Sequence, residues 1–398
     1  MEPLVLSHYG LVTCLGAGKD ATRQALMAGM SGLKPCDFET AAIPTYIGAV
    51  TGADDTPLTG SFTPFDCRNN RLAVMALAQD GFGRAVADAR ARYGATRIAL
   101  VLGTSTSGIH QTEVDYRQRD PQTGALPPGF DYHCTHNTFS LGRFLRSYLG
   151  IDGPAFVVST ACSTTGKVFA SAARLIESGL CDAAIVGGAD SLSLTTLYGF
   201  RSLGLTAEAP CRPFAVDRTG ISLGEAAGFA LLERAGAVDD DNAVRVLGVG
   251  ESSDAHHMSS PHPEGAGARL AMERALARAG IEPAQIDYVN LHGTGTPVGD
   301  SAEDRAILDV LGAETPCSST KGLTGHTLGA AGIVETLIST LSIEGNFMPG
   351  GGAGRVPDPE LRANYLDAPR LARVDRVMSN AFGFGGSNCS VILGRAPC

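Results

Sequence analysis

The chain has 398 residues, 44% of them hydrophobic and 18% charged, with a formal net charge of −10 at pH 7 and an isoelectric point near 5.4. This length and balance predict a globular protein with a large core, built from two domains or two fused halves, and they exclude an intrinsically disordered chain. The acidic balance argues against nucleic acid as a partner.

The sequence predicts neither a membrane span nor a disulfide framework. No apolar run reaches the about 18 residues that a membrane-spanning helix needs. Residues 1–8 lack the basic start of a signal peptide, so we expect a cytoplasmic protein. The ten cysteines lie far apart without a Cys-x-x-Cys pair, and we expect them to be free thiols.

The first half of the chain alternates between strand and helix patterns. Residues 4–16 predict a strand and a glycine turn, and residues 21–30 predict a helix. An amphipathic helix with a basic beginning follows at 68–77. A buried strand at 98–102 leads into the polar loop 103–108, and α/β sheets place ligands in loops of this kind.

A polar stretch then interrupts the alternation. Residues 111–140 contain three prolines and few apolar residues, so they do not read as a core element. We expect this excursion to cover a surface or a partner.

The stretch around Cys162 is the centre of the first half. Residues 155–159 predict a buried strand, the helical spacing from residue 168 to Gly179 predicts a helix, and residues 183–186 predict another strand. This βαβ unit places Cys162 where strand passes into helix, and the N–H groups and helix dipole there push a thiol toward thiolate. A buried core cysteine is the alternative, but small polar neighbours favour a reactive one.

The second half repeats this pattern. Residues 239–242, Asp-Asp-Asp-Asn, are the clearest break in composition, and we predict one half at 1–240 and another at 241–398. The repeat predicts an internal duplication. The expected elements are strands at 244–249 and 286–291, helices at 266–279, 302–311 and 333–341, and a final hairpin at 377–393.

A cysteine nucleophile needs a base or a hydrogen-bond donor, and histidine is the usual one. Among nine histidines, His292 and His326 stand out, because each lies beside glycine in a loop next to a strand or a buried helix. Two neutral imidazoles near Cys162 could donate hydrogen bonds to a developing enolate oxygen. A zinc site formed by the same three residues is the alternative, which we rank lower because no local ligand pair anchors it.

Two charges and a glycine turn complete the candidate site. Lys321 and Glu335 lie in apolar or glycine-rich surroundings. Buried charges are tolerated chiefly as pairs, so we expect contact between them, although a surface lysine and a helix glutamate also fit the spacing. The N–H groups of the turn at 382–386 could complete an oxyanion hole.

Together these residues resemble the elongating β-ketoacyl-acyl-carrier-protein synthases. The matching motifs follow in the same order over nearly the whole chain. They are Thr160-Ala-Cys-Ser163, His292-Gly-Thr-Gly-Thr296, Lys321-Gly-Leu-Thr-Gly-His326, Glu335 and Asn380-Ala-Phe-Gly-Phe-Gly-Gly-Ser-Asn388.

The resemblance implies an α/β, thiolase-like fold, in which two pseudo-duplicated halves form five αβαβα layers, and a dimer. It implies that Cys162 takes an acyl chain from an acyl carrier protein. His292 and His326 would assist the decarboxylation of malonyl-carrier protein and stabilise the enolate, while Lys321 and Glu335 would order the site.

The resemblance also assigns the surroundings of the nucleophile. Backbone N–H groups of Cys162 and Phe384 would hold the thioester oxyanion. Phe384 and Gly385 would form a gate that moves with the loop of Asp254. The phosphopantetheine arm comes from the carrier protein, so no metal or other cofactor is expected, and the tunnel for this arm would be lined by Thr294 and Thr296.

Related enzyme classes fit less well. Initiating synthases and chalcone-type enzymes pair His with Asn, and degradative thiolases carry a second catalytic cysteine in a glycine motif that does not surround Cys389. A non-catalytic, chain-length-factor-like subunit lacks the nucleophile that Cys162 supplies. A cysteine hydrolase has only the Cys/His pair in its favour.

Four segments look like the synthases of bacterial aryl-polyene clusters, which act with a chain-length-factor-like partner. The resemblance therefore leaves open a homodimer or a heterodimer. The segments are Gly103-Thr-Ser-Thr-Ser-Gly-Ile109, Cys162-Ser-Thr-Thr-Gly-Lys167, Pro35-Cys-Asp-Phe38 and Cys67-Arg-Asn-Asn-Arg71.

Three arginines, Arg68, Arg71 and Arg201, fall where family members dock the acidic carrier protein. We expect a basic docking surface there, because opposite charges steer the two proteins together.

Overall fold

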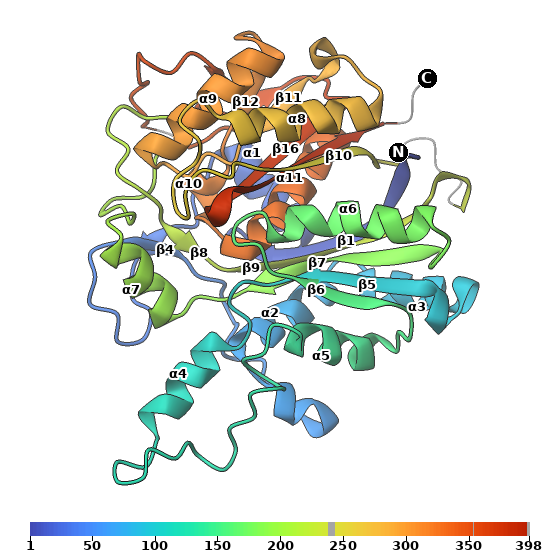
Figure 1. Cartoon of the computed structure of the whole chain (residues 1–398), viewed down its shortest axis with the longest axis vertical. Coiled ribbons are helices and arrows are strands. Elements are labelled where there is room, and N and C mark those ends of the chain that lie inside the picture. The colour runs from blue at the N-terminus through green and yellow to red at the C-terminus, as the bar shows by residue number, and fades with distance from the viewer. Residues whose placement is uncertain (238–242, 353, 396–398) are drawn as a thin grey trace.

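A computed structural model describes residues 1–237, 243–352 and 354–395 (Figure 1). The strands before residue 238 are β1 (Leu4–Thr13), β2 (Gly16–Ala17), β3 (Lys34–Pro35), β4 (Tyr46–Gly48), β5 (Ile98–Gly103), β6 (Ala155–Val158), β7 (Ala183–Asp190), β8 (Leu223–Gly224) and β9 (Ala226–Arg234). The helices there are α1 (Gly18–Ala28), α2 (Arg68–Leu77), α3 (Phe82–Tyr93), α4 (Ile109–Arg117), α5 (Ser140–Leu149), α6 (Thr164–Glu177) and α7 (Leu194–Ser202).

The second part of the chain repeats the mixture of strands and helices. Its strands are β10 (Arg245–Ser253), β11 (Tyr288–Asn290), β12 (Pro316–Ser318), β13 (Phe347–Met348), β14 (Asn364–Tyr365), β15 (Arg370–Leu371), β16 (Arg376–Gly383) and β17 (Ser387–Gly394). Its helices are α8 (Ala266–Ala279), α9 (Pro297–Leu311), α10 (Lys321–Thr324) and α11 (Ala331–Gly345).

One 12-stranded sheet runs through both halves in the order β14-β12-β11-β16-β17-β10-β1-β9-β7-β5-β6, with β2 paired to β1. In the first half, β9 is antiparallel to β1 and β7, while β5 is parallel to β7 and β6. In the second half, β17 is antiparallel to β10 and β16, while β11 is parallel to β16 and β12. The halves thus share one topology and meet where β1 pairs with β10.

The elements form the five layers that the resemblance implied. Helices α6 and α11 pack on each other in the middle, with α6 against β5 and β7 and α11 against β9 and β16. Helices α2, α3 and α5 cover the outer face of the first half, and α8 covers β10 and β17 of the second with α9 beside it (Figure 1). The predicted thiolase-like fold is confirmed.

The middle layer explains why one predicted helix is apolar on every side. Helix α11 packs on α6 and on strands of both halves, and all residues from Ala331 to Ile343 are buried. A helix that is apolar all round must lie inside a protein. Its one charged residue in that stretch, Glu335, therefore lies in the interior.

The boundary predicted between residues 240 and 241 lies outside the described residues and stays a prediction. No described helix is long and apolar enough to cross a membrane. The nine described cysteines are all free.

Two elements differ from expectation. The excursion at 111–140 begins with helix α4 and continues as an irregular segment that projects from the body (Figure 1). Helix α7 was not predicted, because Leu197 is the only buried residue among its nine and it therefore has no apolar stripe.

A substitution at Gly187 in β7 tests how closely β7 and β9 pack in the sheet. Its φ is +142°, and a Cβ there would lie 2.1 Å from the carbonyl oxygen of Gly228 in β9. We expect Gly187→Ala to lower the free energy of unfolding by about 3 kcal/mol through backbone strain and overlap, measured by urea denaturation. Gly129→Ala is the control, because no atom lies within 4 Å of its Cβ position. Equal stability of the two variants would contradict the packing.

Candidate active site

Cys162 lies in a tight turn between β6 and α6. The preceding residue, Ala161, has a left-handed backbone with φ +52°, which is strained for a residue other than glycine. The carbonyl of Ala161 accepts hydrogen bonds from the hydroxyls of Thr164 (2.6 Å) and Ser105 (3.3 Å), which hold the turn. Cys162 is 6% exposed, at the strand-to-helix position that the sequence predicted.

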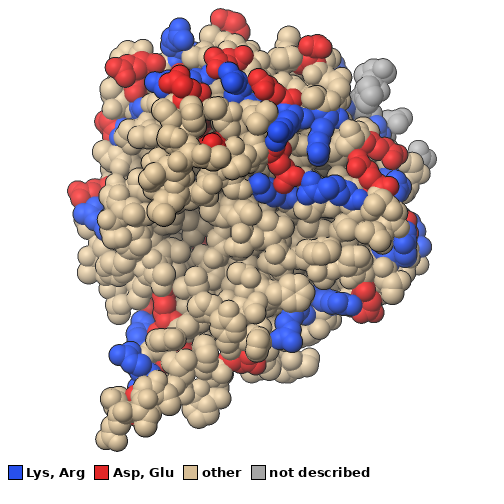
Figure 2. Space-filling view, in the orientation of Figure 1, with Lys and Arg blue, Asp and Glu red and all other residues tan. Residues whose placement is uncertain are grey.

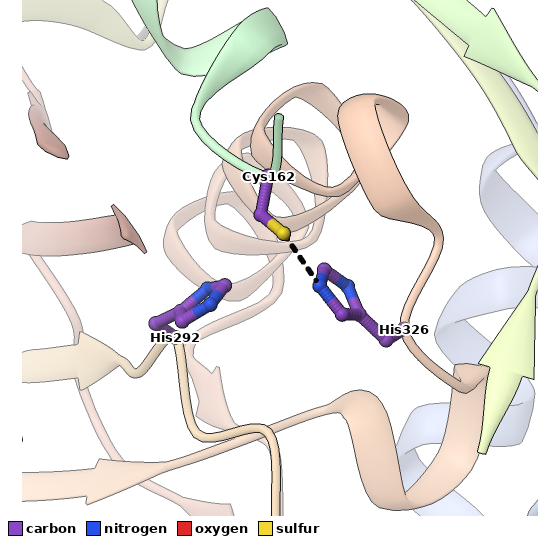
Figure 3. Close-up of side chains that lie close together, drawn as sticks. All are labelled: Cys162, His292 and His326. Carbon is purple, nitrogen blue, oxygen red and sulfur yellow. Dashed lines mark hydrogen bonds between the residues drawn. The ribbon is translucent and has the colours of Figure 1, made fainter. Parts of the chain in front are cut away.

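Both predicted histidines point at this thiol (Figure 3). His326, in the loop after α10, has its Nε2 3.0 Å from Sγ of Cys162. His292, in the loop after β11, lies with its ring centroid 5.4 Å from that of His326 and nearly perpendicular, at 84°. The structure thus brings together three residues that both halves of the chain supply.

Burial sets the protonation of all three groups. It raises the pKa of the Cys162 thiol to about 11, although Lys321 and the backbone N–H of Phe384 lower it. Burial also lowers the pKa of His292 and of His326 well below 6.5, and Lys321 acts in the same direction. At neutral pH the resting site therefore holds a thiol and two neutral imidazoles.

This result corrects the expectation of a thiolate at the start of α6. The favourable charges near the sulfur are outweighed by the loss of solvent around it. The nearby Nε2 of His326 is placed to take the proton when the thiol reacts.

Lys321 and Glu335 form the predicted buried pair. Their side chains are 1% and 3% exposed, and Nζ of Lys321 donates a hydrogen bond to Oε1 of Glu335. Burial raises the pKa of Glu335 to about 7, and the attraction of Lys321 opposes this shift. The pair brings a positive charge into the interior beside the thiol and the imidazoles.

The zinc alternative rests on the same three residues. The ligand atoms of Cys162, His292 and His326 lie within 4.8 Å of one another, and this is a ligand set that zinc accepts. However, the Lys321 ammonium already lowers the pKa of all three groups, so its field also opposes a dication. That the site works without a metal stays a prediction.

Two carboxylates of α9 hold the His292 loop, and the sequence analysis missed both. Glu303 is buried and accepts the backbone N–H groups of His292 (2.8 Å) and Gly293 (2.7 Å). Asp300 accepts the N–H of Gly295 (3.1 Å). Burial raises the pKa of Glu303 to about 7 and that of Asp300 to about 6. Glu303 had a signal in the sequence, as an acidic residue on the apolar side of the helix predicted at 302–311, whereas Asp300 lies before that predicted helix.

The hairpin tip and the Asp254 loop contact each other, as the gate prediction requires. The N–H of Asp254 donates to the carbonyl of Gly386, and the N–H of Gly385 donates to the carbonyl of Met258, both at 2.8 Å. Gly385 has φ +80°, a conformation that favours glycine. The N–H of Phe384 acts on the Cys162 sulfur, so the tip reaches the nucleophile.

A cavity of about 230 Å³ leads to Cys162. Thr294 and Thr296 line it, with their hydroxyls 2.9 Å apart. The face seen in Figure 2 is hollowed beside the hairpin tip, and few charged side chains surround the hollow. The remaining lining is mainly apolar and includes Phe200, Leu205, Ile221, Phe382 and Phe384.

The docking prediction for Arg68 is wrong. Its side chain is 6% exposed and donates to both carboxylate oxygens of the buried Glu225 and to the exposed Asp54, so its charge is used within the protein. Arg71 is 19% exposed and donates twice to Asp66. Arg201, with 37% exposure and a 3.2 Å contact to Glu208, keeps an accessible charge, and its docking role stays a prediction.

Comparison with known families identifies both halves. The family models of the β-ketoacyl synthase N-terminal and C-terminal domains match residues 2–237 and 243–351. The chain is 33% identical to 3-oxoacyl-[acyl-carrier-protein] synthase 2 of Coxiella burnetii, over 98% of each chain. It is also 33% identical to the protein of that name from Vibrio cholerae, over 98% of this chain and 99% of the relative.

Solved structures show the same relationship. The ketosynthase ApeO, in complex with its chain length factor ApeC from Xenorhabdus doucetiae, matches with a TM-score of 0.90 and 40% identity, over 99% of this chain and 98% of that one. The ishigamide ketosynthase/chain length factor matches with a TM-score of 0.89 and 28% identity over the whole of both chains.

The raised thiol pKa predicts how Cys162 reacts. We expect its rate constant for alkylation by iodoacetamide to rise about tenfold per pH unit from pH 7 to 10, because the thiolate fraction grows with pH below a pKa of about 11. Peptide mass spectrometry would follow the modified residue, with Cys162→Ser as control. A plateau between pH 7 and 9 would show that the resting site holds a thiolate.

Proposed function

This chain belongs to the β-ketoacyl synthase family and is a 3-oxoacyl-[acyl-carrier-protein] synthase of fatty-acid or polyketide chain elongation, and we propose that Cys162 is its nucleophile. The 3.0 Å approach of His326 to Cys162, with His292 beside it, carries this proposal. The reaction is a decarboxylative Claisen condensation in two stages that share one pocket.

In the first stage an acyl chain moves from its carrier protein to the enzyme. His326 takes the proton of the Cys162 thiol, and the sulfur attacks the thioester carbonyl carbon. The backbone N–H groups of Cys162 and Phe384 stabilise the oxyanion. The C–S bond to the phosphopantetheine arm then breaks, and its thiolate takes the proton from His326.

In the second stage malonyl-carrier protein occupies the same cavity. Its C–C bond to the carboxylate breaks, carbon dioxide leaves, and the electron pair forms an enolate. Neutral His292 and His326 donate Nε2–H hydrogen bonds to the enolate oxygen, which requires the lowered pKa of both imidazoles. For this His326 holds its one proton on Nε2, whereas in the first stage the proton is on Nδ1 and Nε2 is free to act as the base. The enolate carbon attacks the acyl thioester carbon, the C–S bond to Cys162 breaks, and the leaving Cys162 thiolate takes up a proton from solvent.

Other residues position these groups. Burial keeps both imidazoles neutral and Lys321 acts in the same direction, while Glu335 compensates the charge of Lys321 in the interior. The hydroxyls of Thr294 and Thr296 face the cavity and offer hydrogen bonds to the amides of the phosphopantetheine arm. The carrier protein supplies this arm, and no step involves electron transfer or a metal.

We further propose a specialised pathway of the aryl-polyene type and a heterodimer with a chain-length-factor-like subunit. The 40% identity to ApeO, which is bound to its chain length factor, supports both and exceeds the 33% identity to the synthase 2 relatives. The projecting segment after α4 and the sheet edge at β6 offer apolar contacts for a partner. The exposed side chains are Tyr132 and Phe139 in that segment, Phe156 in β6, and Tyr116 in α4 itself.

Intact-protein mass spectrometry tests the nucleophile. After incubation with acyl-carrier thioesters, we expect an acyl adduct on the wild type and none on Cys162→Ala. Addition of malonyl-carrier protein should then remove the adduct and release a carrier product longer by two carbons.

The same experiment, run with and without a chain-length-factor-like subunit, distinguishes a heterodimer from a homodimer. An adduct that forms only after addition of a chain-length-factor-like subunit supports the heterodimer, whereas full turnover by the isolated chain supports a homodimer. An adduct under neither condition would show that Cys162 is not the nucleophile.

Arg201 tests carrier docking. We expect Arg201→Glu to raise KM for the acyl carrier protein about tenfold, while acylation by small N-acetylcysteamine thioesters stays unchanged, because these thioesters lack the acidic protein that the Arg201 charge would attract. An unchanged KM would contradict docking at Arg201. By contrast, Arg68→Gln should cost about 3–5 kcal/mol of stability, because it leaves Glu225 buried without its partner.

A further inference from the structure

Helix α7 is held at its N-terminus by a carboxylate from another element. Glu113 of α4 accepts the backbone N–H of Leu194 at 3.0 Å through Oε2 and that of Thr195 at 2.6 Å through Oε1. These N–H groups have no acceptor within α7 itself, since the first turn of a helix lacks partners. The charge also interacts favourably with the positive end of the helix dipole.

The other contacts of α7 include a cap by Ser193, whose hydroxyl oxygen accepts the N–H of Thr196 at 3.2 Å, and the partly buried Leu194 and Phe200, which pack on an apolar cluster. Leu197 is its only buried residue, and its exposed Tyr198 accepts one hydrogen bond, from the N–H of Ala42 at 3.1 Å. A helix with so little buried apolar surface depends on the contacts at its ends. The two hydrogen bonds that Glu113 accepts therefore help to fix where α7 lies.

The other end of α7 reaches the active site. The ring of Phe200 lies 5.8 Å from that of Phe384, at an angle of 48°, and both line the cavity that leads to Cys162. Phe384 follows β16, and its backbone N–H acts on the Cys162 sulfur. A displacement of α7 would thus remove the support of the Phe384 ring.

Helix α4 is itself anchored on the body of the protein. Glu39 accepts a hydrogen bond from Arg117 at 2.8 Å and pairs with Nε2 of His110 at 2.5 Å. From α4 the chain continues into the segment that projects from the body (Figure 1). Glu113 therefore lies between that segment and α7.

We propose that Glu113 is a positioning residue that holds Phe200 of α7 against the Phe384 gate, so that α4 and its projecting segment control access to Cys162. This inference rests on the proposed gate function of Phe384. It gives a partner bound at the projecting segment a physical route to the active site, through one carboxylate and one helix.

The test measures access to Cys162 rather than turnover. N-phenylmaleimide is a bulky thiol reagent, and its rate constant with Cys162 is followed by peptide mass spectrometry. We expect Glu113→Ala to raise this rate constant about fivefold, which corresponds to about 1 kcal/mol and to the usual effect of a lost helix cap. Glu113→Gln, which keeps one acceptor and the shape of the side chain, should give a smaller rise.

The matched control is Glu282→Ala. Glu282 stands at the N-terminal end of the short helix at 283–285 and is remote from α7 in the sequence, so its loss should leave the rate constant unchanged. Phe200→Ala should raise the rate constant as Glu113→Ala does, and the double variant should not exceed the larger single effect, because both act through one contact. Hydrogen exchange at the amides of Leu194 and Thr195 should also become faster in Glu113→Ala.

Two results overturn the inference: an unchanged rate constant in both Glu113 variants, or effects of Glu113→Ala and Phe200→Ala that multiply. If Glu113→Ala does not fold, the rate constant measured for Glu113→Gln is compared with the wild type instead. Phe384→Ala separates the two proposals. If it fails to speed alkylation, the gate function of Phe384 is wrong, whereas a response to Phe384→Ala without a response to the Glu113 variants overturns the role of Glu113 alone.

Discussion

The buried contact between Lys321 and Glu335 is the interaction on which the site depends. Helix α11 lies in the middle layer and is buried along nearly its whole length, so its one interior carboxylate must be paired. Lys321 meets this need and thereby places a cation beside Cys162, His292 and His326. The fold that requires the pair thus also sets the protonation of the reacting groups.

That protonation suits a reaction with two demands on the same residues. Transfer of the acyl chain needs a base for the Cys162 thiol, and the neutral His326 at 3.0 Å can act as one. Condensation needs hydrogen-bond donors for the enolate oxygen. A neutral imidazole supplies an N–H donor without adding charge to the site. Solvent exclusion raises the pKa of the thiol and lowers those of both imidazoles, so one dry pocket serves both stages.

Buried carboxylates also fix the loops that carry the site. Each one accepts backbone N–H groups of a loop or helix end outside its own element, and these donors would otherwise be left unsatisfied. Asp190 joins Ser105 and Thr106 to Gly329, close after His326, and Glu303 holds the His292 loop. Glu225 holds Val50 and Leu192 besides Arg68, and Glu113 extends this arrangement to α7.

The sequence by itself determined the family, the layered fold and the identity of Cys162, His292 and His326. The family and the layered fold followed from the resemblance of the motifs. Local spacing marked the three residues, because a strand, a turn and a helix place Cys162 at a predictable point, and glycine marks both histidine loops. The pairing of Lys321 with Glu335 also followed, from the cost of burying a single charge.

The tertiary structure decided those features of the site that depend on contacts between residues far apart in the sequence. Cys162 and His326 approach to 3.0 Å across 164 positions of sequence, through the packing of α6 on α11. Arg68 appeared basic and exposed in the sequence, yet Glu225 draws it into the interior from 157 positions away. The protonated thiol is likewise a result of folding, since burial raises a pKa that the start of a helix would otherwise lower.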